Sequence, residues 1–311
     1  MLAPPEAAPP LTLARAFEIY CQAHVRTNCK PKTVKDREQI FANHLAHLHD
    51  RKLTSITTGE LSQLLTDLAE TPALANLLYA VLRAFLRWSL SRGMIEKNPL
   101  IFPMPYRKVE RDRVLTDHEL TTVYRAAEEL AYSAAFRPFA FILLFCIHTG
   151  MRKSEVAALK WSYITPDLIT LPAEITKNGK QHVLPNFINH FLKLMPQKSE
   201  YLFPSDRGRP FSSWSVTKRD FDRLCGVSDW VIHDLRRTFA TKIADWQLAQ
   251  PHVIERLLNH SGGSMTPIAR VYNRATYLVE MRTALIAYEK RLALLLGRSW
   301  SPTGHVLARQ A

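Results

Sequence analysis

The sequence lacks the patterns that would bind a metal ion or cross-link a secreted domain. Its four cysteines (Cys21, Cys29, Cys146 and Cys225) are scattered and form no Cys-x-x-Cys pair, which argues against a zinc site and a disulfide framework. There is also no Gly-x-x-x-x-Gly-Lys-[Ser/Thr] phosphate loop and no cluster of Asp and Glu. We therefore expect a protein of the reducing cytoplasm that uses no cofactor and no metal.

Long apolar runs are absent as well. The most apolar stretch, residues 139–147, is too short for a bilayer, which needs roughly 20 residues. The first residues show no basic stretch followed by an apolar one, so we expect no signal peptide.

What the sequence has in excess is positive charge. Lys and Arg number 41 against 28 Asp and Glu, which gives a formal net charge of +13. Such a balance indicates a polyanionic partner, and nucleic acid is the leading candidate. A basic protein whose charge only aids solubility is the alternative, so the motifs must decide. With 311 residues and 47% hydrophobic content, the chain is long enough for two domains with cores of their own.

Helix signals fill the first hundred residues. Apolar periodicity predicts helices over residues 11–26, 33–49 and 71–92, the last ended by Gly93. Thr57 and Glu60 form a capping box, which predicts that a further helix begins there. We expect residues 11–98 to form a compact, all-helical domain after an N-terminal extension, residues 1–10.

A proline-stiffened and then basic stretch follows, over residues 99–113. It contains Pro99, Pro103 and Pro105 and then the basic residues Arg107, Lys108, Arg111 and Arg113. We interpret it as an interdomain linker whose basic side chains lie along a phosphate backbone. A solvated surface loop explains this segment equally well.

The second unit, residues 114–297, combines helices with a short β segment. Thr116 and Glu119 form another capping box, and a strongly apolar helix is predicted through residues 139–147. Strand-like runs over residues 168–184 flank Asn178-Gly179, a pair typical of a two-residue type I′ hairpin turn. Helices are predicted again over residues 212–224 and 229–246 and from residue 253 on. We expect a mainly α fold with a small β-hairpin, and a flexible tail over residues 298–311.

His233 and Arg236 lie three residues apart on a predicted helix, so they share a face beside an apolar stripe. Arg237 lies four residues from His233 and could share that face as well. Spacing alone does not choose between the two arginines. A lone His-x-x-Arg motif is common by chance, and a solvated helix face would explain it.

Further segments of the second unit carry basic, imidazole or phenol side chains. Residues 148–161 read HTGMRKSEVAALKW, residues 233–241 read HDLRRTFAT, residues 257–260 read LLNH and residues 270–275 read RVYNRA. In order and rough spacing they resemble the boxes of the tyrosine recombinase (phage integrase) family. The Tyr-Asn-Arg ending is similar to that of integrases from temperate phages and genomic islands. The resemblance extends from about Leu11 to Leu296 and implies a core-DNA-binding domain followed by a mixed α+β catalytic domain.

The resemblance implies a role for each motif residue in site-specific DNA recombination through a 3′-phosphotyrosine intermediate. It implies that Arg152 and Arg236 clamp the scissile phosphate, that His260 donates a hydrogen bond and that His233 acts in proton transfer. Tyr272 would be the nucleophile, and Lys177, before the Asn-Gly turn, the general acid. Glu155, near Arg152, is expected to support the site. Lys180 is expected to bind DNA.

Several of these residues have simpler explanations. Tyr272 could be a buried aromatic, as could Tyr277 and Tyr288, and His260 could be bonded to carbonyls at a helix end. Lys180, across the turn, is a rival to Lys177. Asn259 stands where the family commonly has glycine, and Lys153-Ser154 replaces the more usual residues after the first arginine, which puts only local backbone geometry in question.

Competing functions share part of this evidence. A type IB topoisomerase would use the same chemistry to relax supercoils, but the helical N-terminal unit and the Tyr-Asn-Arg ending favour a recombinase. In a non-catalytic DNA-binding regulator the pocket would be vestigial, whereas every expected polar group is present. The family resemblance implies double-stranded attachment or core sites as substrate, a homotetramer on DNA, a mobile genetic element and a place on the nucleoid. We expect the leucine-rich stretch 278–296 to dock onto a neighbouring subunit.

Overall fold

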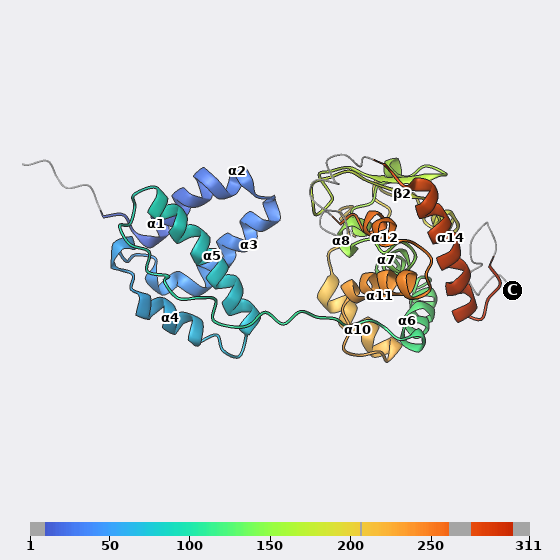
Figure 1. Ribbon diagram of the computed structural model, residues 1–311, viewed down its shortest axis with the longest axis horizontal. Helices are drawn as coiled ribbons and strands as arrows, with labels where there is room; N and C mark the ends of the chain where they lie inside the picture. The colour runs from blue at the N-terminus through green and yellow to red at the C-terminus, as the bar shows by residue number, and fades with distance from the viewer. Residues whose placement is uncertain (1–9, 206, 261–274, 301–311) are drawn as a thin grey trace, which may run out of the picture. The chain divides into compact units, whose positions relative to one another are not determined.

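The computed structural model describes residues 10–205, 207–260 and 275–300. The chain divides into two compact units, one ending at Glu110 and the other beginning at Arg111. Figure 1 shows both as ribbons, and each is described by itself below.

The first unit is helical, and its central helix α5 (Pro72–Ser91) packs against three others. The remaining helical segments are α1 (Leu13–Tyr20), the π-helical turn η1 (Cys21–Val25), α2 (Arg26–Asn28), α3 (Pro31–Leu45), the 3₁₀ turns η2 (Ala46–Leu48) and η3 (Leu53–Ser55), and α4 (Thr58–Thr66). The Phe17 and Phe41 rings stack with centroids 3.7 Å apart, and Phe85 of α5 meets Phe17 edge-on at 5.3 Å. Aromatic packing of this kind adds to the gain from apolar burial.

Local sequence signals explain where these helices begin and end. The Thr57–Glu60 capping box is present in both directions, as predicted. Pro72 occupies the first turn of α5, and Gly93, just beyond its end, adopts a left-handed φ of +68°. The predicted helix over residues 11–26 is confirmed as a run of helical segments, with the π-helical turn in its second half.

The stretch predicted as a linker is largely attached to one unit or the other. Thr58 Oγ1 donates to the carbonyl of Pro99 at 2.8 Å, and the Asn76 amide bonds both main-chain groups of Tyr106. Residues up to Tyr106 therefore pack on the first unit, whereas Arg111 belongs to the second. Between them the side chains of Arg107 and Lys108 are exposed.

The second unit is built around helix α7 (Arg137–Thr149), in which every residue from Phe139 to Thr149 is buried. The other elements are α6 (Asp117–Leu130), α8 (Lys153–Ala157), η4 (Trp161–Tyr163), β1 (Leu168–Leu171), β2 (His182–Pro185), α9 (Asn189–Leu192), α10 (Trp214–Cys225), α11 (Ile232–Asp245), α12 (Pro251–Leu257) and α14 (Leu278–Leu295). Figure 1 shows α6, α11 and α12 grouped around α7. The capping box of Thr116 and Glu119 begins α6, as predicted.

Strands β1 and β2 pair antiparallel, with Leu168 opposite Pro185 and Leu171 opposite His182. The predicted two-residue hairpin is wrong, because residues 172–181 connect the strands. Gly179 has a φ of +68°, but Asn178 does not share the positive φ that a type I′ turn requires at both positions. Lys177 and Lys180 are therefore loop residues and not a cross-strand pair.

Helix α14 buries its apolar face within its own unit. The buried positions include Met281, Leu285, Tyr288 and Leu292, and the Tyr288 hydroxyl donates to the Ile147 carbonyl of α7 at 3.0 Å. The prediction that this face docks onto a neighbouring subunit is therefore wrong. The exposed apolar side chains of α14 are Val279 and Leu294.

Polar contacts also fix α14 and the residues that follow it. His148 Nδ1 lies 2.6 Å from Oε1 of Glu289, and the His148 Nε2 lies 3.0 Å from the Tyr124 hydroxyl. Arg298 forms a two-pronged ion pair with Glu128, with both N···O distances at 2.6 Å. The flexible tail predicted from residue 298 is therefore wrong for Arg298 itself.

Candidate active site

The first candidate, Arg152, follows a turn that only glycine can make. Gly150 ends α7 with a φ of +64°, and a Cβ at this position would lie 2.4 Å from Cδ1 of Phe239. The chain then passes through Met151 to Arg152, which begins α8. Arg152 therefore lies two residues beyond the point where the end of α7 packs against α11.

Arg236 is buried, with 3% of its surface exposed, and its guanidinium bridges two of the other boxes. Nη1 donates to the Gly150 carbonyl at 2.7 Å, and Nη2 donates to the carbonyl of Leu258. Burial and then the positive charge of Arg152 lower the pKa of Arg236 to about 10. The group is still charged at neutral pH, so the site favours an anion.

Arg237, which spacing left as an alternative, lies in a different environment. Its Nη1 bonds Oδ1 of Asp234 at 2.6 Å, and a third of its side chain is exposed. Asp234 is fully buried and is shared by this arginine and Arg111. The contacts with the other boxes are therefore made by Arg236.

Glu155 connects the first arginine to the Lys177 loop. Its carboxylate accepts from Arg152 Nη1 at 3.0 Å and from the Arg152 main-chain N–H at 3.4 Å. The same carboxylate accepts from the main-chain N–H of Lys177 at 3.2 Å. Glu155 is 1% exposed, so it is a fixed internal support.

The Lys177 loop is also tied to the third box, by a contact that the sequence gave no reason to expect. Asn178 Nδ2 donates to the carbonyl and to the side-chain oxygen of Asn259, both at 3.0 Å. Lys180 follows the turn: its main-chain N–H donates to Asn178 Oδ1 at 3.1 Å, and its carbonyl accepts from Thr176 Oγ1 at 2.8 Å. Both lysine side chains are exposed.

Asn259 has a φ of +47°, in the left-handed region that glycine occupies most easily. Asparagine is among the residues that tolerate this region best, so the departure from the family's glycine keeps the turn. The turn leads to His260, whose Nδ1 lies 3.1 Å from Oε2 of Glu255. Burial and the charge of Arg236 lower the pKa of His260, although Glu255 opposes them.

His233 lies at the start of α11, in a positive field. Desolvation lowers its pKa, and the charges of Arg237, Arg236, Arg152 and Lys177 lower it further. The pKa is therefore below the usual 6.5, and the imidazole is neutral at pH 7. A neutral imidazole can accept a proton, as a general base must.

Of the candidate tyrosines, Tyr272 lies outside the described residues. Tyr277 precedes α14 with a φ of +55°, and its ring contacts His252, with centroids 4.8 Å apart. Tyr288 is a core residue with 1% exposure, and burial raises its pKa above the ordinary range. Tyr288 therefore cannot reach DNA.

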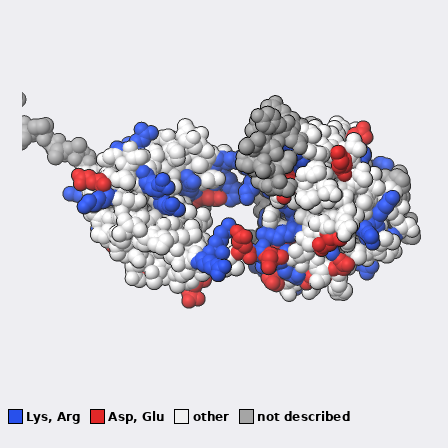
Figure 2. All heavy atoms as spheres, in the orientation of Figure 1, with Lys and Arg blue, Asp and Glu red and all other residues white. Residues whose placement is uncertain are grey.

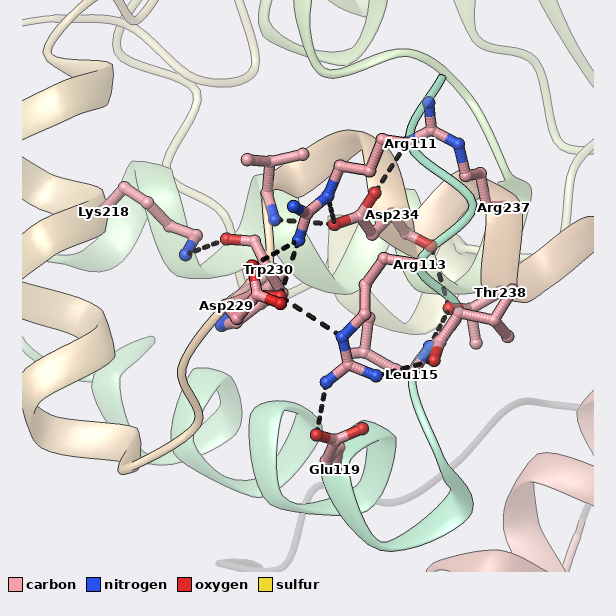
Figure 3. Close-up of polar contacts among 12 residues, drawn as sticks. Arg111, Arg113, Leu115, Glu119, Lys218, Asp229, Trp230, Asp234, Arg237 and Thr238 are labelled. Carbon is pink, nitrogen blue, oxygen red and sulfur yellow. Dashed lines mark hydrogen bonds and ion pairs between the residues drawn. The ribbon is translucent and has the colours of Figure 1, made fainter. Parts of the chain in front are cut away.

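Two of the arginines predicted to bind DNA form ion pairs within the second unit. Arg111 Nε bonds Oδ2 of Asp234 at 2.9 Å, and Arg113 pairs with Glu119, whose pKa it lowers to about 2 (Figure 3). Figure 2 shows further Lys and Arg side chains on both units. Arg107, Lys108 and Lys180 are exposed and are not ion-paired in the part of the chain that the structure describes.

Sequence reasoning gave no role in the site to four residues that shape it: Asn178, His182, Asp234 and Glu255. His182 is buried at the start of β2, where its Nε2 lies 3.1 Å from the Arg256 carbonyl, and burial lowers its pKa to about 4. Asp234 and Glu255 each lie within five residues of a candidate, a proximity that could have drawn attention to them. The described residues hold no group of three or more His, Cys, Asp or Glu side chains suited to a metal ion. None of the described helices is long and apolar enough to cross a membrane.

Residues 113–278, more than half of the chain, match the phage integrase family. The prophage integrase IntZ of Escherichia coli (strain K12) is 25% identical over 268 residues, which cover 82% of this chain and 64% of that protein. The tyrosine recombinase XerC of Pediococcus pentosaceus is 26% identical over 209 residues, covering 61% of this chain and 68% of that protein. A solved lambda integrase tetramer bound to a Holliday junction aligns with a TM-score of 0.65 and 21% identity, over 85% of this chain and 84% of the lambda chain.

The helical first unit, the site around Arg152 and Arg236 in the second unit, and these matches together indicate one class of protein. The chain belongs to the phage integrase family. It spans less than two thirds of the length of the IntZ relative.

Proposed function

We propose that this protein is a site-specific tyrosine recombinase that cleaves and rejoins DNA strands through a 3′-phosphotyrosine intermediate, for the integration or excision of a mobile element. The observation that carries the proposal is the guanidinium of Arg236. It is buried, charged and bonded to main-chain carbonyls of both the first and the third box. Such a group is suited to hold an anion at the point where the boxes meet.

Each site residue then has a chemical role. Arg152 and Arg236 bind the non-bridging oxygens of the scissile phosphate and stabilise the negative charge that grows in the transition state. His260 donates a further hydrogen bond, and Glu155 orients Arg152 and the Lys177 loop. Lys177 protonates the departing 5′-oxygen.

Tyr272 attacks, and its proton must leave first. A phenol has a pKa near 10, so forming the tyrosinate at pH 7 costs about 4 kcal/mol. The cationic site offsets this cost, and neutral His233 is able to take the proton. Because the phosphotyrosine keeps the energy of the cleaved bond, rejoining proceeds without ATP, cofactor or metal.

The substrate is double-stranded DNA carrying specific attachment or core sites, and the working assembly is a homotetramer on DNA in the cytoplasm, at the nucleoid. The lambda integrase to which the fold is similar was solved as a tetramer on a Holliday junction, which supports this assembly. Arg107, Lys108 and Lys180 are exposed and available for phosphate contacts.

A nicked suicide substrate tests the proposal directly. The wild-type protein should form a covalent DNA adduct, and peptide mapping should find it on Tyr272. The Tyr277→Phe variant should form the same adduct, whereas the Tyr272→Phe variant should form none. An adduct on Tyr277 would overturn the assignment of the nucleophile.

Two further assays separate the competing functions. A recombinase joins two sites in a two-site recombination assay, whereas a type IB topoisomerase only relaxes supercoiled DNA. A DNA-binding regulator does neither and forms no adduct.

A further inference from the structure

Arg111 is the first residue of the second unit, and its side chain is anchored on helix α11. Nε bonds Oδ2 of the buried Asp234 at 2.9 Å, while Nη2 bonds the main-chain carbonyl of Asp229 at 2.6 Å and its carboxylate at 3.1 Å. These three contacts reach residues 118 and 123 positions away in the sequence. The planar guanidinium uses the N–H groups of Nε and Nη2 to attach this part of the chain to the start of α11.

The residues after Arg111 extend this attachment along the same helix. Arg113 Nε donates to the Asp229 carbonyl at 3.2 Å, and the Leu115 main-chain N–H donates to Thr238 Oγ1 at 2.9 Å. Thr238 Oγ1 in turn donates to the Asp234 carbonyl at 2.8 Å. Figure 3 shows these contacts joining residues 111–115 to α11.

Asp234 is the point on which these contacts converge. Its side chain is 0% exposed and accepts from the Val231 main-chain N–H at 2.9 Å, from Arg111 and from Arg237. A buried carboxylate depends on such partners, because an unpaired charge in the interior is strongly disfavoured. The Asp234 carboxylate therefore depends on Arg111 for part of its stabilisation, and Arg111 helps to hold it in place.

Asp234 lies between the two site residues of α11. His233 directly precedes it and Arg236 follows two residues later, all within the first turns of the helix. A rotation or fraying of this turn would move the His233 imidazole and the Arg236 guanidinium together. An error of about 1 Å in placing catalytic groups is enough to cost on the order of a hundredfold in rate.

We propose that Arg111 and Asp234 form a positioning pair, which holds the first turn of α11 so that His233 and Arg236 meet the scissile phosphate in register. The proposal rests on the recombinase function proposed above and assigns Arg111 a role other than binding DNA. The segment that follows the first unit is thus attached to α11, the helix that carries His233 and Arg236.

The test compares Arg111→Gln, Arg111→Lys and Asp234→Asn with Arg223→Gln as the matched control. Arg223 is an arginine of the same unit on α10, but 72% of its side chain is exposed. Cleavage of a nicked suicide substrate is measured in single turnover at saturating protein, and DNA affinity is measured over a range of salt concentrations. Thermal melting of each variant reports whether the fold is kept.

Arg111→Gln should lower the cleavage rate at saturation at least tenfold, while the Kd stays within twofold and its salt slope is unchanged. Arg111→Lys should recover part of the rate, because its ammonium can still reach Asp234. The double variant with Asp234→Asn should be no slower than the slower single variant. Arg223→Gln should leave the saturated rate, the Kd and the salt slope unchanged, because its side chain is exposed on α10.

A second measurement does not depend on activity. In the DNA-free protein, NMR titration should show the pKa of His233 rising toward 6.5 in Arg111→Gln, because a frayed first turn lets water reach the imidazole. Arg223→Gln should leave it unchanged. A wild-type cleavage rate and an unmoved His233 titration in Arg111→Gln would overturn the positioning pair, as would a loss of affinity with a shallower salt slope. If the wild-type protein formed no adduct, the recombinase function would fail, while the titration would still decide the pairing.

Discussion

The Arg236 guanidinium donates to the Gly150 carbonyl at 2.7 Å, so a helix and a turn 86 residues apart in the sequence share one hydrogen bond. The Nη2 of the same guanidinium donates to the carbonyl of Leu258, within the third box. Arg236 is therefore both a candidate phosphate ligand and the residue that holds the site together.

We expect Arg236→Lys to lower single-turnover cleavage by a factor on the order of 10² to 10³, as is usual when a transition-state donor is lost. A lysine ammonium gathers its donors on one atom, so it does not span the separated Gly150 and Leu258 carbonyls as the planar guanidinium does while also contacting a phosphate. Arg237→Lys is the control, since Arg237 pairs with Asp234 outside this arrangement, and it should lose less than tenfold. A larger loss in Arg237→Lys than in Arg236→Lys would mean that the two arginines have been exchanged.

Lys177→Ala should cleave ordinary DNA very slowly, because the 5′-alkoxide would have to leave without a proton. A substrate with sulfur in place of the bridging 5′-oxygen should restore its rate, since a thiolate leaves unaided. Arg152→Ala should gain far less from the same substrate, because its defect is in charge stabilisation. Equal rescue of both variants, or rescue of Lys180→Ala alone, would assign the acid to another residue.

The stability of the protein should depend on His182 at acid pH. The folded pKa of about 4 lies below the ordinary 6.5, so between these values the unfolded chain binds more protons than the folded one. The free energy of unfolding should therefore fall as the pH drops from 6.5 to 4, by about 3 kcal/mol for this group.

Urea unfolding at pH 7 and at pH 4.5 measures this effect. His182→Gln keeps a donor for the Arg256 carbonyl but does not titrate, so it should lose less stability between the two pH values than the wild type. His118→Gln, at an exposed histidine of the same unit, should behave like the wild type. A pH dependence in His182→Gln as steep as that of the wild type would contradict the assignment.

Helix α14 should stabilise its own unit. Leu285→Ala removes a side chain that is 3% exposed and should cost about 2 to 5 kcal/mol of unfolding free energy. Leu294→Ala on the same helix removes one that is 69% exposed and should change stability by less than about 0.5 kcal/mol. Equal effects of the two substitutions in urea unfolding would show that α14 is not packed in this way.

Local signals predicted much of the fold. The capping boxes of Thr57 and Thr116 were predicted correctly because both partners of each box lie within three residues. The Asn178-Gly179 turn was predicted wrongly because its conformation depends on Asn259, 81 residues away. A strong local turn preference does not outweigh tertiary hydrogen bonds of this kind.

The sequence predicted which residues make up the site better than it predicted their contacts. The boxes named Arg152, Glu155, His233, Arg236 and His260, the Asn-Gly turn named Lys177, and the structure describes all of them. The sequence could not predict that Arg111 is ion-paired with Asp234, because nothing near either residue indicates the pairing. Likewise, the amphipathic pattern of α14 indicated a buried face but could not indicate which surface covers it.

Gly150 and Phe239 cannot change independently. The Phe239 ring occupies the space of a Cβ at position 150, so an alanine there would need a smaller side chain at position 239. That smaller residue would in turn leave a void beside Tyr288, whose ring centroid lies 4.8 Å from that of Phe239. A side chain at position 150 therefore requires a second substitution at position 239, and the pair of changes costs the stability that the void beside Tyr288 removes.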